Sequence, residues 1–456
     1  MAGYTRFAKL PSFIYLQRQL TGMQTLKQLQ TGKLKGSASL KLAEGLTNFP
    51  EEIFELADTL EVLDLSRNKL SSLPADFGRL KKLRILFCSE NLFTVLPEVL
   101  ADCALLEMVG FKANRIEVVP AKSLNPHLRW LILTDNKVGA LPAEIGNCHR
   151  MQKLMLAGNK LTELPEELSN CRNLALLRIS ANRLNQLPGW LLTMPKLSWL
   201  AFSGNPFSRN HAVESLDLIS WSELEIKQLL GEGASGVISK ATWCMPDETR
   251  HVAVKVFKGA VTSDGLPEDE MNTCITAGSH AGLVRVIGQI DGHPENKRGL
   301  VMELIPPGFF NLGLPPSLES CTRDVFVEGM KLRAQQVLKI AGTIASVAAQ
   351  LHSRGIMHSD LYAHNTLIDD EGNTLFGDFG AACFYDQNDP ELAPALERLE
   401  VSAYGCLLDD LLSLCDEATT HPDLIRLGEL RDQCMVPGVL ARPGFQYLKD
   451  ELQAAL

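Results

Sequence analysis

The feature that most restricts what this chain can fold into is a motif repeated seven times in its N-terminal half. Each copy alternates apolar and polar positions and then reaches an asparagine, as in LEVLDLSRNKLSSLP (60–74). The asparagines fall 23 residues apart, with one step of 22, at Asn68, Asn91, Asn114, Asn136, Asn159, Asn182 and Asn205. Copies at so constant a spacing predict a solenoid, in which each copy adds one short strand and buries its apolar face against its neighbours.

This pattern resembles a leucine-rich repeat array. The resemblance implies that each asparagine side chain bonds backbone groups where the chain leaves its strand, and that the stacked asparagines form a ladder. An earlier, degenerate copy, LKLAEGL (40–46), has Gly45 at the asparagine position. With the segment before it, this copy is expected to form the N-terminal cap.

Alternation along each strand predicts which side chains face the concave surface of the array. Most of them are apolar, and a contiguous exposed apolar face usually marks a site for a protein partner. The alternative is that the other half of the chain, or a neighbouring subunit, covers it. The candidate partner-binding residues are Ile85, Phe87, Met108, Trp130, Ile132, Met155, Leu176 and Trp199.

The repeats stop after the seventh copy, so we expect a repeat domain over residues 1–215 and a second domain over 216–456. The chain has no apolar run of the roughly 18 residues needed to cross a bilayer, and its first 20 residues lack a signal peptide's apolar core. Its eleven cysteines show no metal-ligand spacing. These features predict a cytoplasmic protein with no membrane partner and with reduced thiols.

The two halves differ in charge. Residues 1–215 carry 26 Lys+Arg against 19 Asp+Glu, or +7, and residues 216–456 carry 18 against 35, or −17. No block of basic residues indicates a nucleic-acid partner. The opposite charges would allow the array to dock on its own C-terminal half and restrain it.

The C-terminal half contains motifs in a recognisable order. LLGEGASGVISKATW (229–243) has glycines at 231, 233 and 236 between two strand-like stretches, which favours a hairpin over nucleotide phosphates rather than the start of a helix. HVAVKVFK (251–258) follows and contains Lys255. The next segment is expected to begin a helix with several acidic residues. Among these, Glu270 is the best-placed partner for Lys255, and Glu268 and Asp269 are alternates.

The strongest signal lies further on, where His358-x-Asp360-x-x-x-x-Asn365 precedes Asp-Phe-Gly at 378–380. Six elements in this order resemble the eukaryotic-type protein kinase family over residues 220–456. The resemblance implies a two-lobed α+β domain that uses ATP and Mg²⁺, after an α/β repeat solenoid.

The resemblance also implies residue roles. Asp360, with Lys255 and Asn365, would be catalytic, Asn365 and Asp378 would hold Mg²⁺, and Glu270 would form the supporting ion pair. The ATP-binding candidates are Gly231, Glu232, Gly233, Ala234, Ser235, Gly236, Ile238, Ala253, Lys255, Met302, Glu303, Ile305 and Leu367.

Several positions depart from the family pattern. Ser359 replaces the arginine that would neutralise a phosphorylated activation loop, and residues 381–400 contain a single hydroxyl, that of Tyr385. The closing motif of that segment is degraded to DPE (389–391), whose Glu391 would pair with Arg442. Glu400 stands where an aspartate is usual.

Tyr362 and His364 bear most directly on the chemistry. Serine/threonine kinases tend to have a phosphate-contacting lysine at the first of these positions, and tyrosine kinases have Ala there, with Arg at the second. Loss of one positive charge could cost a few kcal/mol of transition-state stabilisation unless His364 compensates.

We therefore predict a protein kinase, serine/threonine-directed on base rates, whose repeats recruit a substrate or regulator. The alternatives are a catalytically weak or inactive nucleotide-binding scaffold and a small-molecule phosphotransferase.

Overall fold

The computed structural model describes residues 24–208, 216–233, 235–259, 262 and 264–454, and these form two compact units. The N-terminal unit contains residues 24–197 with Asn205–Phe207, and the C-terminal unit contains Ser198–Gly204 with residues from 216 onward. The domain boundary expected near residue 215 falls at 209–215, which lie outside the described residues.

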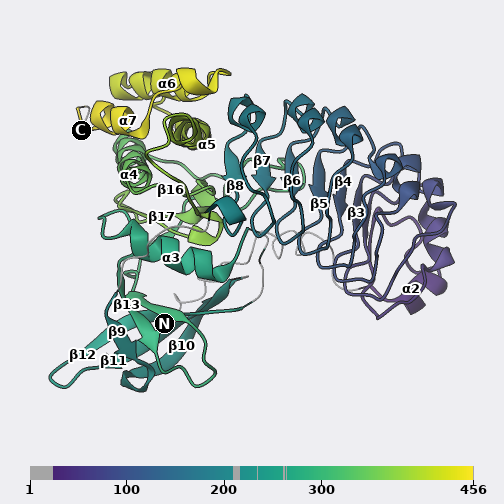
Figure 1. Ribbon diagram of the computed structural model, residues 1–456, viewed down its shortest axis with the longest axis horizontal. Coiled ribbons are helices and arrows are strands. Elements are labelled where there is room, and N and C mark those ends of the chain that lie inside the picture. Colours follow the sequence, from purple (N-terminus) through teal and green to yellow (C-terminus); the bar gives the residue numbers. More distant parts are fainter. Residues whose placement is uncertain (1–23, 209–215, 234, 260–261, 263, 455–456) are drawn as a thin grey trace. The chain divides into compact units, whose positions relative to one another are not determined.

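The repeats form one sheet of eight parallel strands in chain order, as the sequence predicts (Figure 1). The strands are β1 (Ser39–Lys41), β2 (Val62–Asp64), β3 (Ile85–Phe87), β4 (Met108–Gly110), β5 (Trp130–Ile132), β6 (Lys153–Met155), β7 (Leu176–Arg178) and β8 (Trp199–Ala201). Short 3-10 helices return the chain between strands, at Glu51–Leu56, Phe77–Arg79, Glu98–Asp102, Ala121–Ser123, Ala143–Asn147, Glu166–Asn170 and Gly189–Thr193. Leucines such as Leu63 and Leu86 are fully buried between the two layers.

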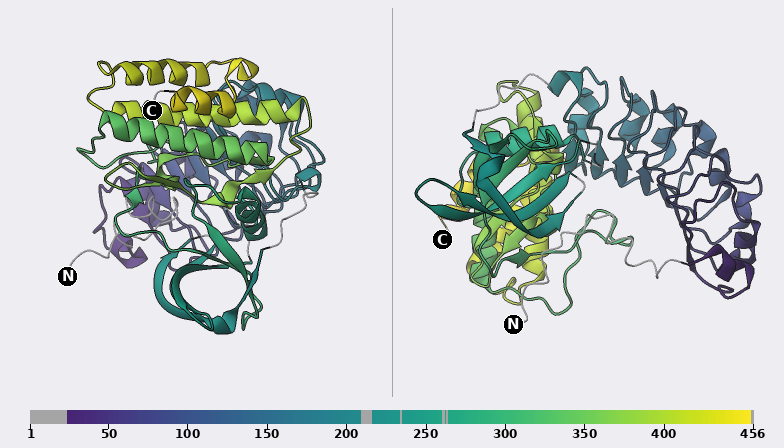
Figure 2. Two further views of the ribbon diagram at one scale, coloured as in Figure 1. Left: turned by 90° about the vertical axis from the view of Figure 1, so that its left-hand side faces the viewer. Right: turned by 90° about the horizontal axis from the view of Figure 1, so that it is seen from below.

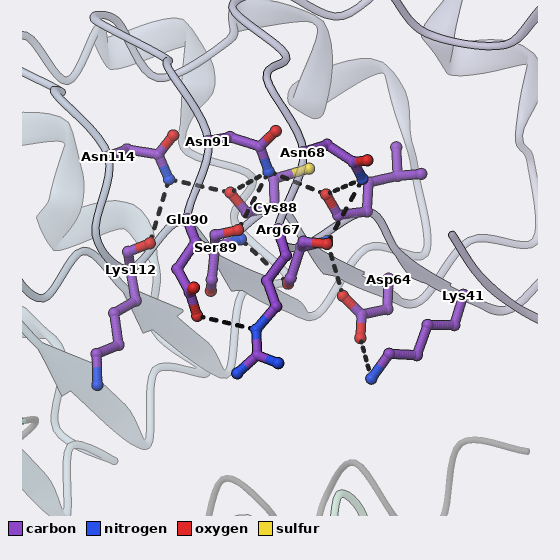
Figure 3. A network of polar contacts seen from close by, with 12 residues as sticks. Lys41, Asp64, Arg67, Asn68, Cys88, Ser89, Glu90, Asn91, Lys112 and Asn114 are labelled. Carbon is purple, nitrogen blue, oxygen red and sulfur yellow. Dashed lines mark hydrogen bonds and ion pairs between the residues drawn. The ribbon is translucent and has the colours of Figure 1, made fainter. Parts of the chain in front are cut away.

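The asparagine ladder is confirmed (Figure 3). Asn91 Nδ2 donates to the carbonyls of Leu65, at 2.9 Å, and Cys88, at 3.1 Å, while its Oδ1 accepts from the N–H of Leu70 at 2.9 Å. One side chain thus satisfies three buried backbone groups from two successive repeats. Because the next repeat supplies the partner each time, no copy could satisfy these groups alone.

A second regularity is not visible in the sequence. The residue before each ladder asparagine has a positive φ, between 53° and 72°, although only two of the seven are glycine; the set is Arg67, Glu90, Ala113, Asp135, Gly158, Ala181 and Gly204. A left-handed backbone costs a non-glycine residue about 1 kcal/mol or more. The hydrogen bonds of the neighbouring asparagine hold the turn against this cost.

The degenerate first copy does form a strand, β1, and the segment before it covers the edge of the sheet. Gln24 Oε1 accepts from the N–H of Lys41 at 2.9 Å, which occupies a backbone donor that an edge strand would leave open. The short helix α2 (Leu26–Gln30) follows Gln24 and begins with a capping box, in which Thr25 Oγ1 accepts from the N–H of Gln28 at 3.2 Å.

The predicted apolar partner face differs from the expected open surface. All eight of its side chains are buried, with exposed fractions of 1–9%. Part of this burial comes from packing between strands, since the rings of Phe87 and Trp130 meet edge to face at 6.5 Å and Lys153 Nζ lies 4.4 Å from the centre of the Trp130 ring. Alternation predicted which side chains leave the core of the array, but not that all eight would be buried.

The first lobe of the C-terminal unit is a strongly curved six-stranded sheet in the order β10-β11-β12-β14-β13-β9 (Figure 2). Apolar alternation builds its core, because Val252 and Val254 pack with Ala241 and Val301 while Ala253 and Lys255 point to the other face. Its elements are β9 (Leu218–Ser220), β10 (Leu224–Glu232), β11 (Gly236–Cys244), β12 (Thr249–Phe257), β13 (Val286–Asp291), β14 (Gly299–Glu303) and the helix α3 (Pro267–Ala277).

The second lobe is mainly helical (Figure 1). Its helices are α4 (Ala334–Ser353), α5 (Leu392–Ser413), α6 (Pro422–Cys434) and α7 (Phe445–Gln453). Its strands are β15 (Phe310–Asn311), β16 (Ile356–Met357), β17 (Thr366–Ile368), β18 (Thr374–Phe376) and β19 (Cys383–Phe384). The expected fold class, a repeat solenoid followed by a two-lobed α+β domain, is confirmed. Within the described part of the chain, no helix has the length and hydropathy that a membrane crossing requires.

Candidate active site

The glycine-rich segment is the turn of a hairpin, since β10 and β11 are antiparallel on either side of it. Gly233 donates its N–H to the carbonyl of Gly236 at 2.9 Å. A Cβ on Gly236 would lie 2.6 Å from the carbonyl oxygen of Val256, so only glycine allows this close approach. Lys258 Nζ holds the turn from the neighbouring strand by donating to Glu232 Oε1 at 2.6 Å and to the Gly233 carbonyl at 3.1 Å.

Ser235 bonds through its carbonyl to the N–H of Lys258 at 2.8 Å, whereas Ala234 lies outside the described residues. The turn is therefore tied from both its ends to Lys258, the residue that follows β12, and β12 is the strand that carries Lys255.

Lys255 is paired with Glu270 of α3; the Glu270 side chain is buried and that of Lys255 is partly buried. Glu268, an alternate in the sequence, instead pairs with Arg298 at the surface. Burial would lower the pKa of Lys255, but the carboxylates of Glu270 and Asp378 outweigh it and raise this pKa above its ordinary value. The Lys255 ammonium group therefore stays positively charged near the carboxylate of Asp378.

The candidate adenine-binding residues come partly from neighbouring strands. In the sheet register Ile238 is opposite Lys255, and Ala253 is opposite Met302. Met302 packs against the core near α3, and the Glu303 carboxylate is held by Arg250 at 2.9 Å. The two remaining candidates are not on this sheet: Ile305 lies two residues beyond β14, and Leu367 is on β17.

The catalytic-loop candidates meet at one point between β16 and β18. Asn365 Nδ2 donates to Asp360 Oδ2 at 2.7 Å and to the Asp360 carbonyl at 3.0 Å. The carbonyl of Asn365 accepts from the N–H of Gly377 at 3.2 Å, which brings the neighbouring Asp378 alongside. Asp378 itself has a left-handed backbone, with φ of 66°. Such strain at a non-glycine residue is typical of functional sites, where surrounding contacts fix the conformation.

His358 links the catalytic loop to the Asp-Phe-Gly segment. Its Nε2 lies 3.2 Å from the Gly377 carbonyl, and its ring packs against Phe376, at 4.1 Å between centroids, and Phe379, at 5.0 Å. Burial lowers the pKa of His358, so the imidazole is neutral near pH 7.

Glu400 of α5 anchors the loop backbone. Its carboxylate accepts from the N–H groups of Ser359, at 2.5 Å, and His358, at 3.1 Å, and lies 2.8 Å from His352 Nε2. Burial would raise the pKa of Glu400, but the hydrogen bond with His352, followed by the positive charge His352 can carry, holds this pKa below its ordinary value. Glu400 thus holds Ser359 in a left-handed conformation, with φ of 67°.

Two hydrogen-bonded contacts, one in the loop and one beside its Glu400 anchor, were not predicted from the sequence. Asp324, in the long connection before α4, accepts from the His364 N–H at 2.9 Å and lies 2.7 Å from His364 Nδ1. The second is the hydrogen bond of the Tyr385 hydroxyl with His352 Nδ1 at 2.7 Å, which buries this tyrosine. No motif marks Asp324, because its partner is 40 residues away in sequence.

The expected pairing at the end of the activation segment differs in the structure. Glu391 is exposed just before α5, whereas Arg442 is buried and donates to the carbonyls of Val436 and Arg398, each at 3.0 Å. Helix α5 begins at Leu392, directly after Glu391, so the segment between Gly380 and this helix is short.

Comparisons with known proteins agree with this geometry. Residues 224–401 match the protein tyrosine and serine/threonine kinase family, and residues 59–80, 126–184 and 149–207 match leucine-rich repeats. The chain therefore carries a leucine-rich repeat array N-terminal to a protein kinase domain, and such a domain implies the use of ATP.

Relatives resemble one half or the other. A probable serine/threonine-protein kinase of Dictyostelium discoideum is 31% identical over 174 residues, 37% of this chain and 10% of that protein. The L-type lectin-domain containing receptor kinase V.5 of Arabidopsis thaliana is 31% identical over 208 residues, 44% of this chain and 28% of that protein. The leucine-rich repeat and calponin homology domain-containing protein 1 of Mus musculus is 31% identical over 115 residues, 25% of this chain and 16% of that protein. The chain thus spans less than a third of the length of each.

Proposed function

We propose that the chain is an ATP- and Mg²⁺-dependent protein kinase that phosphorylates serine and threonine. The observation that carries this proposal is the single constellation in which Asp360, Asn365 and Asp378 lie together, beside the ion pair of Lys255 with Glu270. Phosphoryl transfer consists mostly of positioning and charge neutralisation, and these are the groups that it requires.

The residues fit the metal that this chemistry uses. Mg²⁺ prefers hard oxygen ligands, and a carboxylate from Asp378 with an amide oxygen from Asn365 would supply them. The hydrogen bond from Asn365 Nδ2 to Asp360 commits the nitrogen end of the amide, so the oxygen end is the one available as a ligand. When bound, Mg²⁺ would neutralise charge on the phosphates.

The remaining roles belong to the protein's own groups. Asp360 would accept the proton of the attacking hydroxyl as the new O–P bond forms and the bond to the ADP oxygen breaks. Lys255 would contact the α- and β-phosphates, and the backbone of the glycine turn, residues 231–236, would lie over them. Ile238, Ala253, Met302 and Leu367 would contact adenine, with backbone groups near Glu303 and Ile305 bonding its edge.

The direct test follows ³²P from γ-labelled ATP onto a generic basic protein and onto the chain itself. Asp360→Ala and Asp378→Ala should each reduce transfer by about 100-fold or more, since a general base or a metal ligand is lost. Lys255→Ala should weaken ATP binding. Label on serine or threonine that disappears in both aspartate variants supports the proposal, and label confined to tyrosine contradicts the acceptor specificity.

A second candidate is a nucleotide-binding scaffold with little turnover. The observation that favours it is Tyr362, which is buried and places no cation where serine/threonine kinases usually have one. Mg²⁺-dependent ATP binding that Lys255→Ala abolishes, without label on any protein, would support the scaffold. Label on a small molecule alone would support the third candidate, a small-molecule phosphotransferase.

We also propose that the repeats recruit a protein substrate or regulator and that the protein works in the cytoplasm. Leucine-rich repeats are typical of protein interactions, and all eleven cysteines are free thiols, as in reducing compartments.

The opposite charges of the two halves support a further proposal, intramolecular docking of the array on the kinase domain. Unchanged activity and nucleotide affinity after removal of residues 1–215 would contradict that docking.

A further inference from the structure

The last strand of the repeats, β8, lies in the same compact unit as the catalytic loop. Three contacts of β8 and its flanking residues Ser198 and Phe202 reach the catalytic loop, β19 and α5. They explain two departures of this chain from the kinase pattern, and the inference drawn from them rests on the proposed function.

The first contact is with the loop itself. The indole of Trp199 stacks on the ring of Tyr362, with centroids 4.4 Å apart and planes 5° from parallel. Trp199 Nε1–H also donates to the carbonyl of Leu361 at 3.0 Å. One side chain thus fixes both a ring and a backbone carbonyl within two residues of Asp360. Both rings are buried, so the stack is shielded from water.

The second contact reaches the loop through β19. The N–H of Phe202 donates to Cys383 Sγ at 3.0 Å, and the hydroxyl of Ser359 lies 3.7 Å from the same sulfur. Ser359 is the residue that stands in place of the usual arginine. In this chain that position is fully buried and faces a thiol.

The third contact is with α5. Ser198 Oγ lies 2.9 Å from Ser402 Oγ, and both are buried. Ser402 follows two residues after Glu400, whose carboxylate holds the loop backbone. Together with its flanking residues Ser198 and Phe202, β8 therefore contacts the loop, the strand after the Asp-Phe-Gly segment and the helix that anchors the loop.

We propose that β8 is a permanent brace of the catalytic loop, with Trp199 as its positioning residue, and that it replaces activation-loop phosphorylation in this protein. The segment 381–400 offers no serine or threonine, and its single tyrosine hydroxyl is buried on His352. A phosphate there would have no arginine at 359 to bind. The stack on Tyr362 and the contact with Ser359 through Cys383 hold the loop at two positions, and neither contact requires a phosphate.

The test compares four variants of the full-length chain. Trp199→Leu removes both the stack and the N–H donor, while Trp199→Phe keeps an aromatic ring and loses only the donor. Tyr362→Leu removes the stack from the other side. Trp190→Leu, in the half-exposed helix Gly189–Thr193 of the preceding repeat, is the matched control.

We expect kcat to fall by roughly 10- to 100-fold in Trp199→Leu, because small displacements of a catalytic group have effects of this size. Trp199→Phe should recover part of the loss. Combining Trp199→Leu with Tyr362→Leu should cost little more than either alone, since the two residues share one interaction. The Kd for ATP should change by less than about threefold, because the three contacts described above reach the catalytic loop, β19 and α5 rather than the glycine turn.

Hydrogen exchange separates this inference from the proposed function. Amides 358–365 should exchange at least about tenfold faster in Trp199→Leu than in the wild type or Trp190→Leu. If the wild type transfers no phosphate but this acceleration is seen, the kinase proposal fails and the brace stands. If the wild type is active and Trp199→Leu matches it in kcat and in exchange, the brace is overturned. Increased activity in Trp199→Leu would also overturn it, since β8 would then be an inhibitor.

Discussion

At the scale of single residues, the catalytic loop depends on a few buried polar groups that each satisfy several partners. Glu400 accepts from two backbone N–H groups and from His352, although the kinase pattern usually has the shorter aspartate there. The extra methylene lets one carboxylate on α5 reach all three donors. Removing its charge while keeping its size should therefore expose how much the loop depends on it.

Glu400→Gln should destabilise the protein by about 1–3 kcal/mol, because an amide nitrogen would then face a donor and leave a buried N–H unsatisfied. Urea unfolding measures this free energy, and turnover with labelled ATP should fall in parallel. The control is Glu417→Gln, whose side chain is exposed. Equal stability of the two variants would contradict the anchoring role.

His358 gives the loop a pH dependence. Burial places its folded-state pKa below the ordinary value of 6.5. The unfolded chain then binds more protons than the folded one between those two values, so stability is complete above pH 6.5 and falls as the pH drops below it. The expected slope from this residue is about 1.4 kcal/mol for each pH unit.

Unfolding free energies at pH 7.5, 6.5 and 5.5 test this expectation. His358→Gln should flatten the decline by about one proton's contribution, whereas His127→Gln, at an exposed position, should leave it unchanged. A decline in His358→Gln as steep as in the wild type would show that other groups are responsible.

At the scale of elements, the ladder is the device that joins one repeat to the next. Asn159 Nδ2 donates to the carbonyls of Leu133, at 2.8 Å, and Leu156, at 2.9 Å, and its Oδ1 accepts from the N–H of Val138 at 2.9 Å. Asn159→Ala should cost about 3 kcal/mol, because three buried backbone groups lose their partner.

The matched control is Asn173→Ala, since Asn173 is half-buried and its side chain donates to the His149 carbonyl at 2.8 Å and accepts from Lys196 Nζ at 2.8 Å, outside the ladder. Urea unfolding of both variants gives the difference, and hydrogen exchange should place the loss at residues 133–161. A loss of less than about 1 kcal/mol in Asn159→Ala would mean that water replaces the side chain.

The elements also show what the sequence could and could not predict. Periodicity predicted the seven strands of the regular repeats, and motif spacing predicted the glycine hairpin and the catalytic loop, because each is a local pattern with a fixed spacing. It did not predict Asp324 on His364, or Trp199 on Tyr362, because these contacts join residues 40 and 163 positions apart with no shared motif. It also read the apolar strand positions as an open face, whereas the side chains at these positions are buried.

At the scale of the whole molecule, net charge sets which acceptors can approach. Residues 216–456 carry 35 acidic against 18 basic side chains, a net charge of −17. A field of one sign raises the encounter rate of oppositely charged ligands, and salt screens it. The kinase domain should therefore favour basic acceptors, through association rather than through the chemical step.

Two peptides that differ only in lysines or glutamates around one serine test this directly. At low salt, kcat/KM for the lysine peptide should exceed that for the glutamate peptide by about tenfold or more. In 1 M salt, where the Debye length is about 3 Å, the ratio should fall towards unity while kcat stays nearly the same. Asp360→Ala provides the background rate for both peptides. A preference that survives 1 M salt would instead come from direct contacts beside Asp360, and net charge would not be its cause.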